Sequence, residues 1–465
     1  MKRRLVPVHV GLMGHIDHGK TELARVLSDR VSTAGLDKHP QSKARGITID
    51  LGFTMFELGD YLVTLVDAPG HADLIRSVVA GANIIDTGIV VVAADEGPKV
   101  QTGEHIVVLQ SLGVENVLAV ITKTDLVSEK KVSEVERHVR SILSEAGFGG
   151  VESVTVSAKD GTGIDDLKTR LLSVLHPRPR DNVSPLLMPI DHAFPVKGHG
   201  TVATGTLLKG TMSVGDKVQI VPLGKTAKVR SIQTFGEARD RASAGDRVGV
   251  NIPEVQHQDL SRGHYLCAPG SLQQADCLVV DLTKNPLYRG RLTHRLVVSA
   301  SVGMATVTAM VVPLRFENEK KLVLDEMRER RGKIGLVLKE AVPANPGTRV
   351  LLLRTDLAPT RMRIIGAGPV AEIPETLMVH RRKTRIGRVQ RIREDDVLVE
   401  GLASRRLTAE SLKGGVVHTE EGLEGVIREP FGTRGVVSVD FQGVRIKESE
   451  PVVLERLVEE EYRFG

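Results

Sequence analysis

The chain has 465 residues, of which 41% are hydrophobic and 26% are charged, with a formal net charge of +5 and a sequence pI near 9.1. This length exceeds what one hydrophobic core serves, so we expect about three or four domains. The composition is that of an ordinary globular protein, which excludes a disordered or fibrous chain. The basic balance fits a polyanionic partner without identifying one.

Cysteine usage and the N-terminal segment indicate the compartment. Only two cysteines occur, Cys267 and Cys277, and their spacing matches neither a metal site nor a disulfide framework. We expect both to be small core residues of a cytoplasmic protein in a reducing environment. Residues 1–4 and the apolar residues after them mimic a signal start, but this stretch ends after about ten residues, too short for a membrane span. We therefore expect no membrane partner.

The first predicted element is a buried strand over residues 6–13, followed by a glycine loop and a helix. Residues 14–21 match G-x-x-x-x-G-K-[ST], and this context is the one that a phosphate-binding P-loop requires. Glycines let backbone N–H groups face the phosphates, and the helix N-terminus adds positive potential. The expected nucleotide-binding residues here are Asp17, His18, Gly19, Lys20, Thr21 and Glu22. The alternative is a chance glycine turn in which His15, Asp17 and His18 form a metal cluster.

A second apolar strand, over residues 61–66, ends at an acid. Asp67 follows the strand directly, and Gly70 stands shortly after it. An acid at this point can hold the Mg²⁺ shell, and the Gly70 N–H can reach the γ-phosphate. Asp67 alone is also consistent with an ordinary strand-end acid, but its pairing with a P-loop favours a nucleotide role.

Two further short strands, residues 117–121 and 153–156, each precede a polar segment that predicts part of a base pocket. The Asp125 carboxylate can accept hydrogen bonds from guanine N1 and N2, a pattern that adenine does not offer. The stem of Lys123 can cover the base, and residues 157–159 suit the rear of the pocket. The expected base-pocket residues are Thr122, Lys123, Asp125, Ser157, Ala158 and Lys159.

The remaining pattern indicates the domain organisation. Residues 1–178 alternate apolar runs with helical segments at residues 101–112 and 133–146, which predicts a doubly wound α/β domain with a mostly parallel sheet. Residues 176–180 carry two prolines and predict a linker. Short strands separated by glycines follow, and they predict three β-barrel-type domains. The expected domains are residues 1–178, 179–270, 271–376 and 377–465.

The ordered set of nucleotide motifs resembles the translational GTPases. Residues 45–50 are similar to the first switch of that family, and Gly70 stands at the glycine of the second switch. The resemblance implies GTP and GDP binding, GTPase activity stimulated by the ribosome, and His71 as the residue that orients the attacking water, inside an apolar gate of Ile16 and Ile47. It also implies a Mg²⁺ site formed by Thr21, Thr48 and Asp67.

One departure from the family pattern concerns Thr122. The family usually has asparagine there, and a threonine lacks the amide that braces the P-loop and the base. Because Asp125 remains, we expect guanine preference to survive and the effect to fall on nucleotide affinity.

The second domain narrows the resemblance. Residues 194–205 are similar to the start of the second domain of aminoacyl-tRNA carriers such as elongation factor Tu. Residues 191–194, 244–248 and 430–435 are closer to the selenocysteine-specific elongation factors, of the archaeal type. The resemblance covers essentially the whole chain. It implies delivery of selenocysteinyl-tRNA to the ribosome at a recoded stop codon.

Such a carrier must reject seryl-tRNA, and a selenol is acidic enough to be an anion at neutral pH. With the family match, Arg247 and His192 are the candidate donors to this anion, Asp191 can orient them, and Phe53 is a candidate wall of the pocket. Taken singly, Asp191 is more consistent with a turn residue and Arg247 with a surface charge, and Phe53 is equally consistent with a core residue.

Partners beyond the tRNA and the ribosome stay open. The basic run at residues 381–393 predicts contacts with phosphates of the tRNA, of ribosomal RNA or of a recoding mRNA hairpin, and a protein that binds this hairpin is a further candidate. Two other functions remain: a general aminoacyl- or initiator-tRNA carrier, and a regulatory GTPase subunit of a metabolic enzyme, as in sulfate activation.

Overall fold

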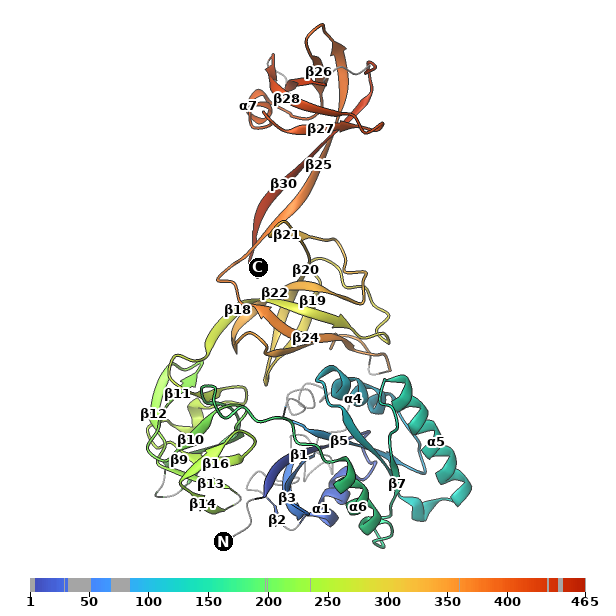
Figure 1. Ribbon diagram of the computed structural model, residues 1–465, viewed down its shortest axis with the longest axis vertical. Coiled ribbons are helices and arrows are strands. Elements are labelled where there is room, and N and C mark those ends of the chain that lie inside the picture. The colour runs from blue at the N-terminus through green and yellow to red at the C-terminus, as the bar shows by residue number, and fades with distance from the viewer. Residues whose placement is uncertain are drawn as a thin grey trace. The chain divides into compact units, whose positions relative to one another are not determined.

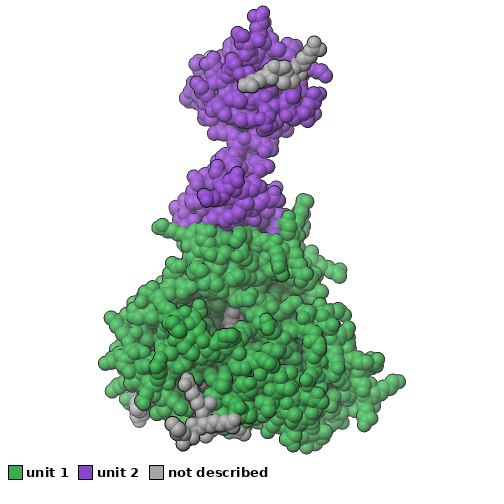
Figure 2. Space-filling model, in the orientation of Figure 1, with its two compact units in different colours: residues 1–311, 328–375, 464 green, residues 312–327, 376–463, 465 purple. Residues whose placement is uncertain are grey.

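The computed structural model of the protein describes residues 5–28, 30–31, 52–67, 84–196, 198, 200–234, 236–358, 360–432, 435–441 and 446–464. The chain divides into two compact units, which have different colours in Figure 2. The first unit comprises residues 1–311, 328–375 and 464, and the second comprises residues 312–327, 376–463 and 465. Among the helices of the described ranges, none is both long enough and apolar enough to cross a membrane.

A seven-stranded sheet with strand order β2-β3-β4-β1-β5-β6-β7 forms the centre of the α/β domain (Figure 1). Strands β4, β1, β5, β6 and β7 are parallel, and β2 and β3 extend one edge in antiparallel pairing, so the expected mostly parallel α/β fold is confirmed. The strands are β1 (Val6–Met13), β2 (Arg30–Val31), β3 (Gly52–Leu58), β4 (Tyr61–Asp67), β5 (Thr87–Ala93), β6 (Asn116–Thr122) and β7 (Ser153–Thr155). The helices are α1 (Lys20–Leu27), α4 (Val100–Ser111), the short 3₁₀ helix η2 (Thr124–Leu126), α5 (Glu129–Glu145) and α6 (Ile164–Val174).

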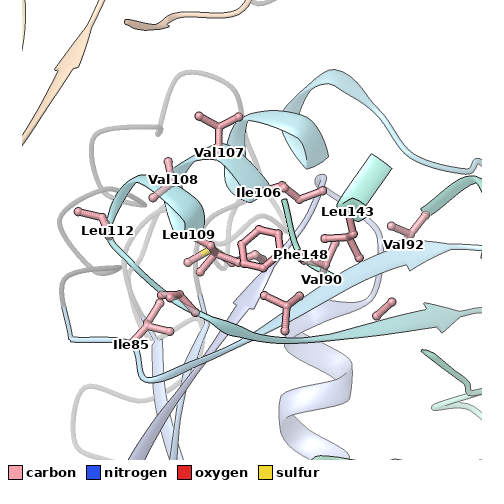
Figure 3. Close-up of a cluster of buried hydrophobic side chains, with 14 of the residues drawn as sticks. Ile85, Val90, Val92, Ile106, Val107, Val108, Leu109, Leu112, Leu143 and Phe148 are labelled. Carbon is pink, nitrogen blue, oxygen red and sulfur yellow. The ribbon is translucent and has the colours of Figure 1, made fainter. Parts of the chain in front are cut away.

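Two apolar cores cover the two faces of this sheet. Along β5 the side chains alternate, so that Val90 and Val92 enter one core while Ile89 and Val91 enter the other. Figure 3 shows the first core, where α4 and Leu143 of α5 close over β5. The second core lies under α1 and α6.

The parallel pairing brings the predicted motifs to one edge of the sheet. The register pairs Leu12 with Asp67, Ala93 with Thr122, and Ile121 with Thr155. The P-loop, Asp67 at the end of β4 and the segments after β6 and β7 therefore all lie at the carboxyl ends of the strands, where α/β proteins bind ligands.

The first barrel follows, and its strands β8, β9 and β16 are neighbours in the order β12-β11-β17-β8-β9-β16-β13-β14. Gly205 is required at the β8–β9 contact because a Cβ there would lie 2.1 Å from the Pro189 carbonyl oxygen. The elements are β8 (Leu187–Val196), β9 (Gly200–Thr206), β10 (Thr211–Ser213), β11 (Lys217–Val221), β12 (Lys225–Lys228), β13 (Ser231–Thr234), β14 (Glu237–Arg239), β15 (Arg241–Ser243), β16 (Arg247–Asn251), η3 (His257–Asp259) and β17 (Tyr265–Cys267).

A second, closed barrel completes the first unit. Its strands follow the order β19-β23-β24-β18-β22-β20, and a β19–β20 pairing closes the ring. Cys267 and Cys277 are buried and free, which confirms that they are core residues. The strands are β18 (Gln273–Lys284), β19 (Val297–Val302), β20 (Ala305–Glu317), β22 (Arg331–Ala344), β23 (Arg349–Leu353) and β24 (Ile364–Glu372), of which β20 continues into the second unit.

The second unit contains the C-terminal barrel, with strand order β25-β26-β29-β28-β27-β30 closed by a β25–β30 pairing. Strands β25 and β30 form a long antiparallel ribbon, from Leu377 opposite Tyr462 to Arg388 opposite Pro451. The barrel's core is apolar and is built mainly from valine and leucine. The elements are β21 (Lys320–Val323), β25 (Leu377–Ile392), β26 (Val397–Glu400), α7 (Arg406–Glu410), β27 (Val416–Thr419), β28 (Glu424–Phe431), β29 (Val436–Asp440) and β30 (Pro451–Tyr462).

A buried polar node joins the sheet, the segment after α6 and the first barrel. Arg180 Nη2 donates to Asp86 Oδ2 over 2.5 Å, and the backbone N–H of His9 donates to the same oxygen over 2.9 Å. His9 Nε2 lies 3.4 Å from the Thr206 hydroxyl. Burial alone would raise the pKa of Asp86, but its hydrogen bonding with His9 and the charge of Arg180 lower it to about 2. Asp86 is therefore an anion that holds three segments together.

Candidate functional site

The loop between β1 and α1 has the backbone that a phosphate cradle requires. Gly14 has a φ of 150°, and a Cβ there would lie 2.2 Å from the Val91 carbonyl oxygen, so a larger residue is excluded. Gly19 has a φ of 82° at the helix N-cap, and Asp17 has a φ of 60°. These left-handed positions turn the loop over the start of α1.

Lys20 is buried under this loop. Its Nζ donates to the His15 carbonyl oxygen over 2.6 Å, and its exposed fraction is 6%. Burial lowers the pKa of Lys20 to about 8, although the charges of Asp67 and Asp17 oppose the shift. The ammonium group therefore lies inside the loop, at the position where a P-loop lysine meets phosphate oxygens.

Thr21 and Asp67 are hydrogen-bonded to each other. The Thr21 hydroxyl donates to Asp67 Oδ2 over 2.6 Å, across the gap between α1 and the end of β4. A hydroxyl and a carboxylate at this spacing are the hard oxygen donors that fit Mg²⁺. Glu22 behaves differently, because its exposed carboxylate accepts from Arg25 Nη1 over 2.9 Å on the surface of α1.

His18 takes part through its backbone. Its side chain is fully buried, with Nδ1 3.3 Å from the Val91 carbonyl oxygen, and burial lowers its pKa to about 4. Within the described ranges, no three His, Cys, Asp or Glu side chains form a group that could hold a metal ion, which argues against the alternative of a cluster at His15, Asp17 and His18.

Thr122 contacts the P-loop directly. Its hydroxyl donates to the His18 carbonyl oxygen over 2.7 Å, and the exposed fraction of Thr122 is 2%. This position therefore keeps a contact with the P-loop although it lacks the amide that the family usually has there. The short Thr122 side chain reaches the P-loop because the loop passes close to the end of β6. A Cβ placed on Gly19 would lie 3.7 Å from the Thr122 hydroxyl oxygen.

The two base-pocket segments lie against each other. Lys123 has a φ of 57°, which turns the chain into η2, and the N–H of Thr124 donates to the Val156 carbonyl oxygen over 3.4 Å. Asp125 is exposed, and Ser157 after β7 is buried. Residues 158–159 continue from it toward the surface, with Ala158 partly buried and Lys159 exposed. The Asp125 carboxylate is thus accessible to a ligand.

The sequence analysis missed a buried link from α4. His105 Nδ1 accepts a hydrogen bond from the Gly14 N–H over 2.8 Å, and burial lowers the pKa of His105 to about 3, so the ring is neutral. Its neighbour Glu104 accepts from Arg363 Nε over 2.8 Å and Nη2 over 2.6 Å, with side-chain exposures of 0% and 4%. The sequence feature that could have indicated this link is the acid and the histidine directly before the apolar residues 106–109 of a buried helix.

The candidate aminoacyl residues of the first barrel form one cluster. Arg247 donates to Asp191 Oδ2 over 2.6 Å from Nη1 and to Oδ1 over 3.2 Å from Nη2. His192 Nδ1 lies 3.1 Å from Asp191 Oδ1, and the Thr204 hydroxyl donates to that oxygen over 2.6 Å. Burial would raise the pKa of Asp191, but the charge of Arg247 and the hydrogen bonds of His192 and Arg247 hold it well below its usual range.

This cluster rules out two simpler interpretations. Asp191 lies within β8 and is not a turn residue, and Arg247 at the start of β16 is 5% exposed and is not a surface charge. Phe53, from β3 of the α/β domain, belongs to the core and also reaches the cluster. The Arg247 guanidinium lies 3.4 Å from the centroid of the Phe53 ring, and the His192 ring meets Phe53 edge-on with centroids 6.5 Å apart.

Three expected site residues, Thr48, Gly70 and His71, lie outside the described residues, as does Ile47 of the expected apolar gate.

The P-loop on a parallel sheet, the Thr21–Asp67 pair and the two base-pocket segments define a P-loop GTPase that carries β-barrel domains. Residues 7–186 match the elongation factor Tu GTP-binding domain family, residues 200–267 match elongation factor Tu domain 2, and residues 272–374 match domain III of archaeal selenocysteine-specific elongation factors. The chain is 40% identical to the selenocysteine-specific elongation factor of Methanocaldococcus jannaschii over 97% of each chain. It belongs to the family of selenocysteine-specific elongation factors, which are translational GTPases.

Two other relatives extend the comparison. The chain is 39% identical to the selenocysteine-specific elongation factor of Mus musculus over 66% of this chain and 57% of the relative. Translation elongation factor SelB from Methanococcus maripaludis, solved in complex with the GTP analogue GppNHp, is similar with a TM-score of 0.77 and 36% identity over 99% of both chains. The expected fold class is confirmed.

Proposed function

We propose that this chain binds GTP with Mg²⁺, carries selenocysteinyl-tRNA to a ribosome at a recoded stop codon, and hydrolyses GTP there. The observation that carries the proposal is the cluster of Asp191, His192 and Arg247 beside a GTPase site, with Phe53 of the α/β domain lying against Arg247. A guanidinium in this cluster offers a charged donor for a selenolate, which a neutral serine hydroxyl cannot match.

The nucleotide role rests on the edge of the sheet. Lys20 meets the phosphates, Asp125 accepts from guanine, and Thr21 and Asp67 hold Mg²⁺, with Thr48 as a further ligand outside the described residues. When bound, Mg²⁺ neutralises charge on the β- and γ-phosphates.

The hydrolytic role is proposed for His71, with Gly70 on the γ-phosphate. The His71→Ala variant should bind GTP and tRNA normally but lose ribosome-stimulated turnover, since positioning the attacking water is most of the catalysis. Wild-type stimulated turnover in this variant would remove His71 from the mechanism.

The C-terminal barrel is proposed to contact the recoding hairpin, the ribosome, or a protein that binds the hairpin. Part of the basic run on β25 is neutralised across the ribbon, because Lys383 pairs with Glu460 over 2.9 Å and Arg382 lies 3.7 Å from Glu455. Arg388 and Arg391 are exposed and form no ion pair with a residue that the structure describes, so they are the better candidates for phosphate contacts.

Filter binding with selenocysteinyl-, seryl- and cysteinyl-tRNA, each with GTP and with GDP, tests the function. We expect tight binding only for the selenocysteinyl form with GTP. Equal binding of all three tRNAs would indicate a general carrier, and no tRNA binding in any state would indicate a GTPase that regulates another protein.

A further inference from the structure

The aminoacyl cluster is closed to a ligand as it stands. The exposed fractions are 0% for Phe53, 5% for Arg247 and 6% for Asp191, and only the His192 side chain is partly exposed, at 30%. The guanidinium is covered by the Phe53 ring on one side and paired with Asp191 in its plane. A selenolate can reach Arg247 only if one of these covering groups moves.

Strand pairing indicates which of the two covering groups, Phe53 or Asp191, can move without disrupting the barrel. Asp191, Thr204 and Arg247 lie on β8, β9 and β16, which are hydrogen-bonded neighbours in one sheet. Separating them would break main-chain hydrogen bonds. Phe53 comes from a different sheet, and the contact that it makes with Arg247 is between side chains. Phe53 is therefore the member of the cluster that can leave while the barrel stays intact.

The strand that carries Phe53 is tied to the nucleotide site. In the register of β3 and β4, Gly52 lies opposite Asp67 and Phe53 lies opposite Val66. Asp67 in turn accepts the hydrogen bond from Thr21 at the start of α1. Phe53 therefore lies one register step from the Thr21–Asp67 pair, so a displacement of this end of β4 would act on the strand that carries the Phe53 ring.

We propose that Phe53 is a lid on Arg247, which closes the aminoacyl pocket in the GDP state and withdraws in the GTP state. This inference rests on the proposed function, since a carrier must hold its aminoacyl end with GTP and release it after hydrolysis. Arg247 and Asp191 then form the fixed floor of the pocket, and the nucleotide controls access to it. The nucleotide can shift the balance between the closed and open pocket only by as much as its affinities for the two states differ.

Removal of the lid gives a result that a permanent pocket wall would not. With GDP, the Phe53→Ala variant should bind selenocysteinyl-tRNA roughly ten- to thirtyfold more tightly than the wild type, the range that a desolvated cation–π contact supplies. With GTP, its affinity should stay close to that of the wild type. If Phe53 instead contacts the bound selenocysteine, affinity with GTP falls, and the proposal is overturned.

Two further variants separate the lid from simple loss of packing. Phe53→Leu keeps most of the apolar volume but lacks the ring face. It should also narrow the difference between the affinities for selenocysteinyl-tRNA with GTP and with GDP. Phe56→Ala lies on the same strand, 3% exposed, in the opposite core under α1 and away from Arg247, so it should leave that difference unchanged. Affinities for GTP and GDP, measured in parallel, report whether each variant is folded.

The outcomes also separate this inference from the proposed function. If the wild type does not prefer selenocysteinyl- over seryl-tRNA with either nucleotide, the proposed function fails whatever Phe53 does. If the wild type shows the preference, but Phe53→Ala and Phe53→Leu keep its ratio of GTP to GDP affinities, Phe53 is not a lid.

Discussion

Replacing Thr122 with valine should weaken the binding of GTP and GDP alike while leaving the preference for guanine unchanged. The Thr122 hydroxyl donates to the His18 carbonyl oxygen over 2.7 Å in a site where Thr122 is 2% exposed. Valine keeps the shape of threonine but removes this donor, and the carbonyl loses a partner that water cannot readily replace. Asp125, which selects the base, is untouched.

A buried hydrogen bond lost in this way costs about 1–3 kcal/mol. If the P-loop of the variant relaxes in the free protein, nucleotide binding has to order it again, and the cost appears as a loss of nucleotide affinity of roughly five- to a hundredfold. If the loop does not relax, the cost appears in the free energy of unfolding. Titration with fluorescent GTP and GDP analogues and urea unfolding of the free protein therefore have to be measured together.

Two variants control this experiment. Thr122→Ser keeps the hydroxyl and should behave almost as the wild type, whereas Thr122→Asn restores the family's usual amide and should bind at least as tightly. If valine leaves both nucleotide affinities within about twofold and the free energy of unfolding unchanged, the contact with His18 does not brace the P-loop.

Three further predictions concern residues elsewhere in the first unit. Asp125→Asn should weaken the binding of GTP and favour that of xanthosine triphosphate by about ten- to a hundredfold, since a charge-assisted hydrogen bond contributes roughly 1.5–3 kcal/mol. An unchanged nucleotide preference in competition binding would contradict the base pocket. Asp86 has a folded-state pKa lowered from 3.8 to about 2, so its stabilisation is present above pH 4 and lost between about pH 4 and 2. Asp86→Asn should therefore cost ~2 kcal/mol in urea unfolding at pH 7 and show no such loss in acid. Removing either Glu104 or Arg363 should cost about 3–5 kcal/mol of unfolding free energy, and Glu104→Leu combined with Arg363→Met should cost less than either single change; additive losses would mean that the pair is not coupled.

The nucleotide site could be predicted because its chemistry is local in sequence. Residues 14–21 contain the glycines, the lysine and the threonine of the cradle, and the strand predicted over residues 6–13 is β1. The helices were expected over residues 101–112 and 133–146 and extend over Val100–Ser111 and Glu129–Glu145. In each case a strand or helix period and a short motif point to the same structure.

Contacts between distant segments could not be predicted in this way. Arg363 and Glu104 are 259 positions apart, and no periodicity relates them. The Thr122 hydroxyl reaches His18 only because the loop passes close to β6, a distance that the residue type does not reveal. The resemblance to a family suggested that Phe53 and Arg247 belong to one pocket, but the stacking that closes this pocket required the three-dimensional structure.

The ribbon of β25 and β30 makes the C-terminal barrel a module that can be removed or replaced as a unit. The chain leaves for this barrel and returns from it on hydrogen-bonded neighbours, with Lys383 opposite Arg456 just before the strands of the barrel begin. A tight reverse turn could join these two positions and excise the barrel while the rest of the ribbon keeps its ladder. Conversely, any module whose two ends lie about 5 Å apart, the spacing of paired strands, could be grafted at the same point. Recombination at this one pair of positions in the ribbon is thus enough, in evolution or in protein engineering, to replace one accessory module by another.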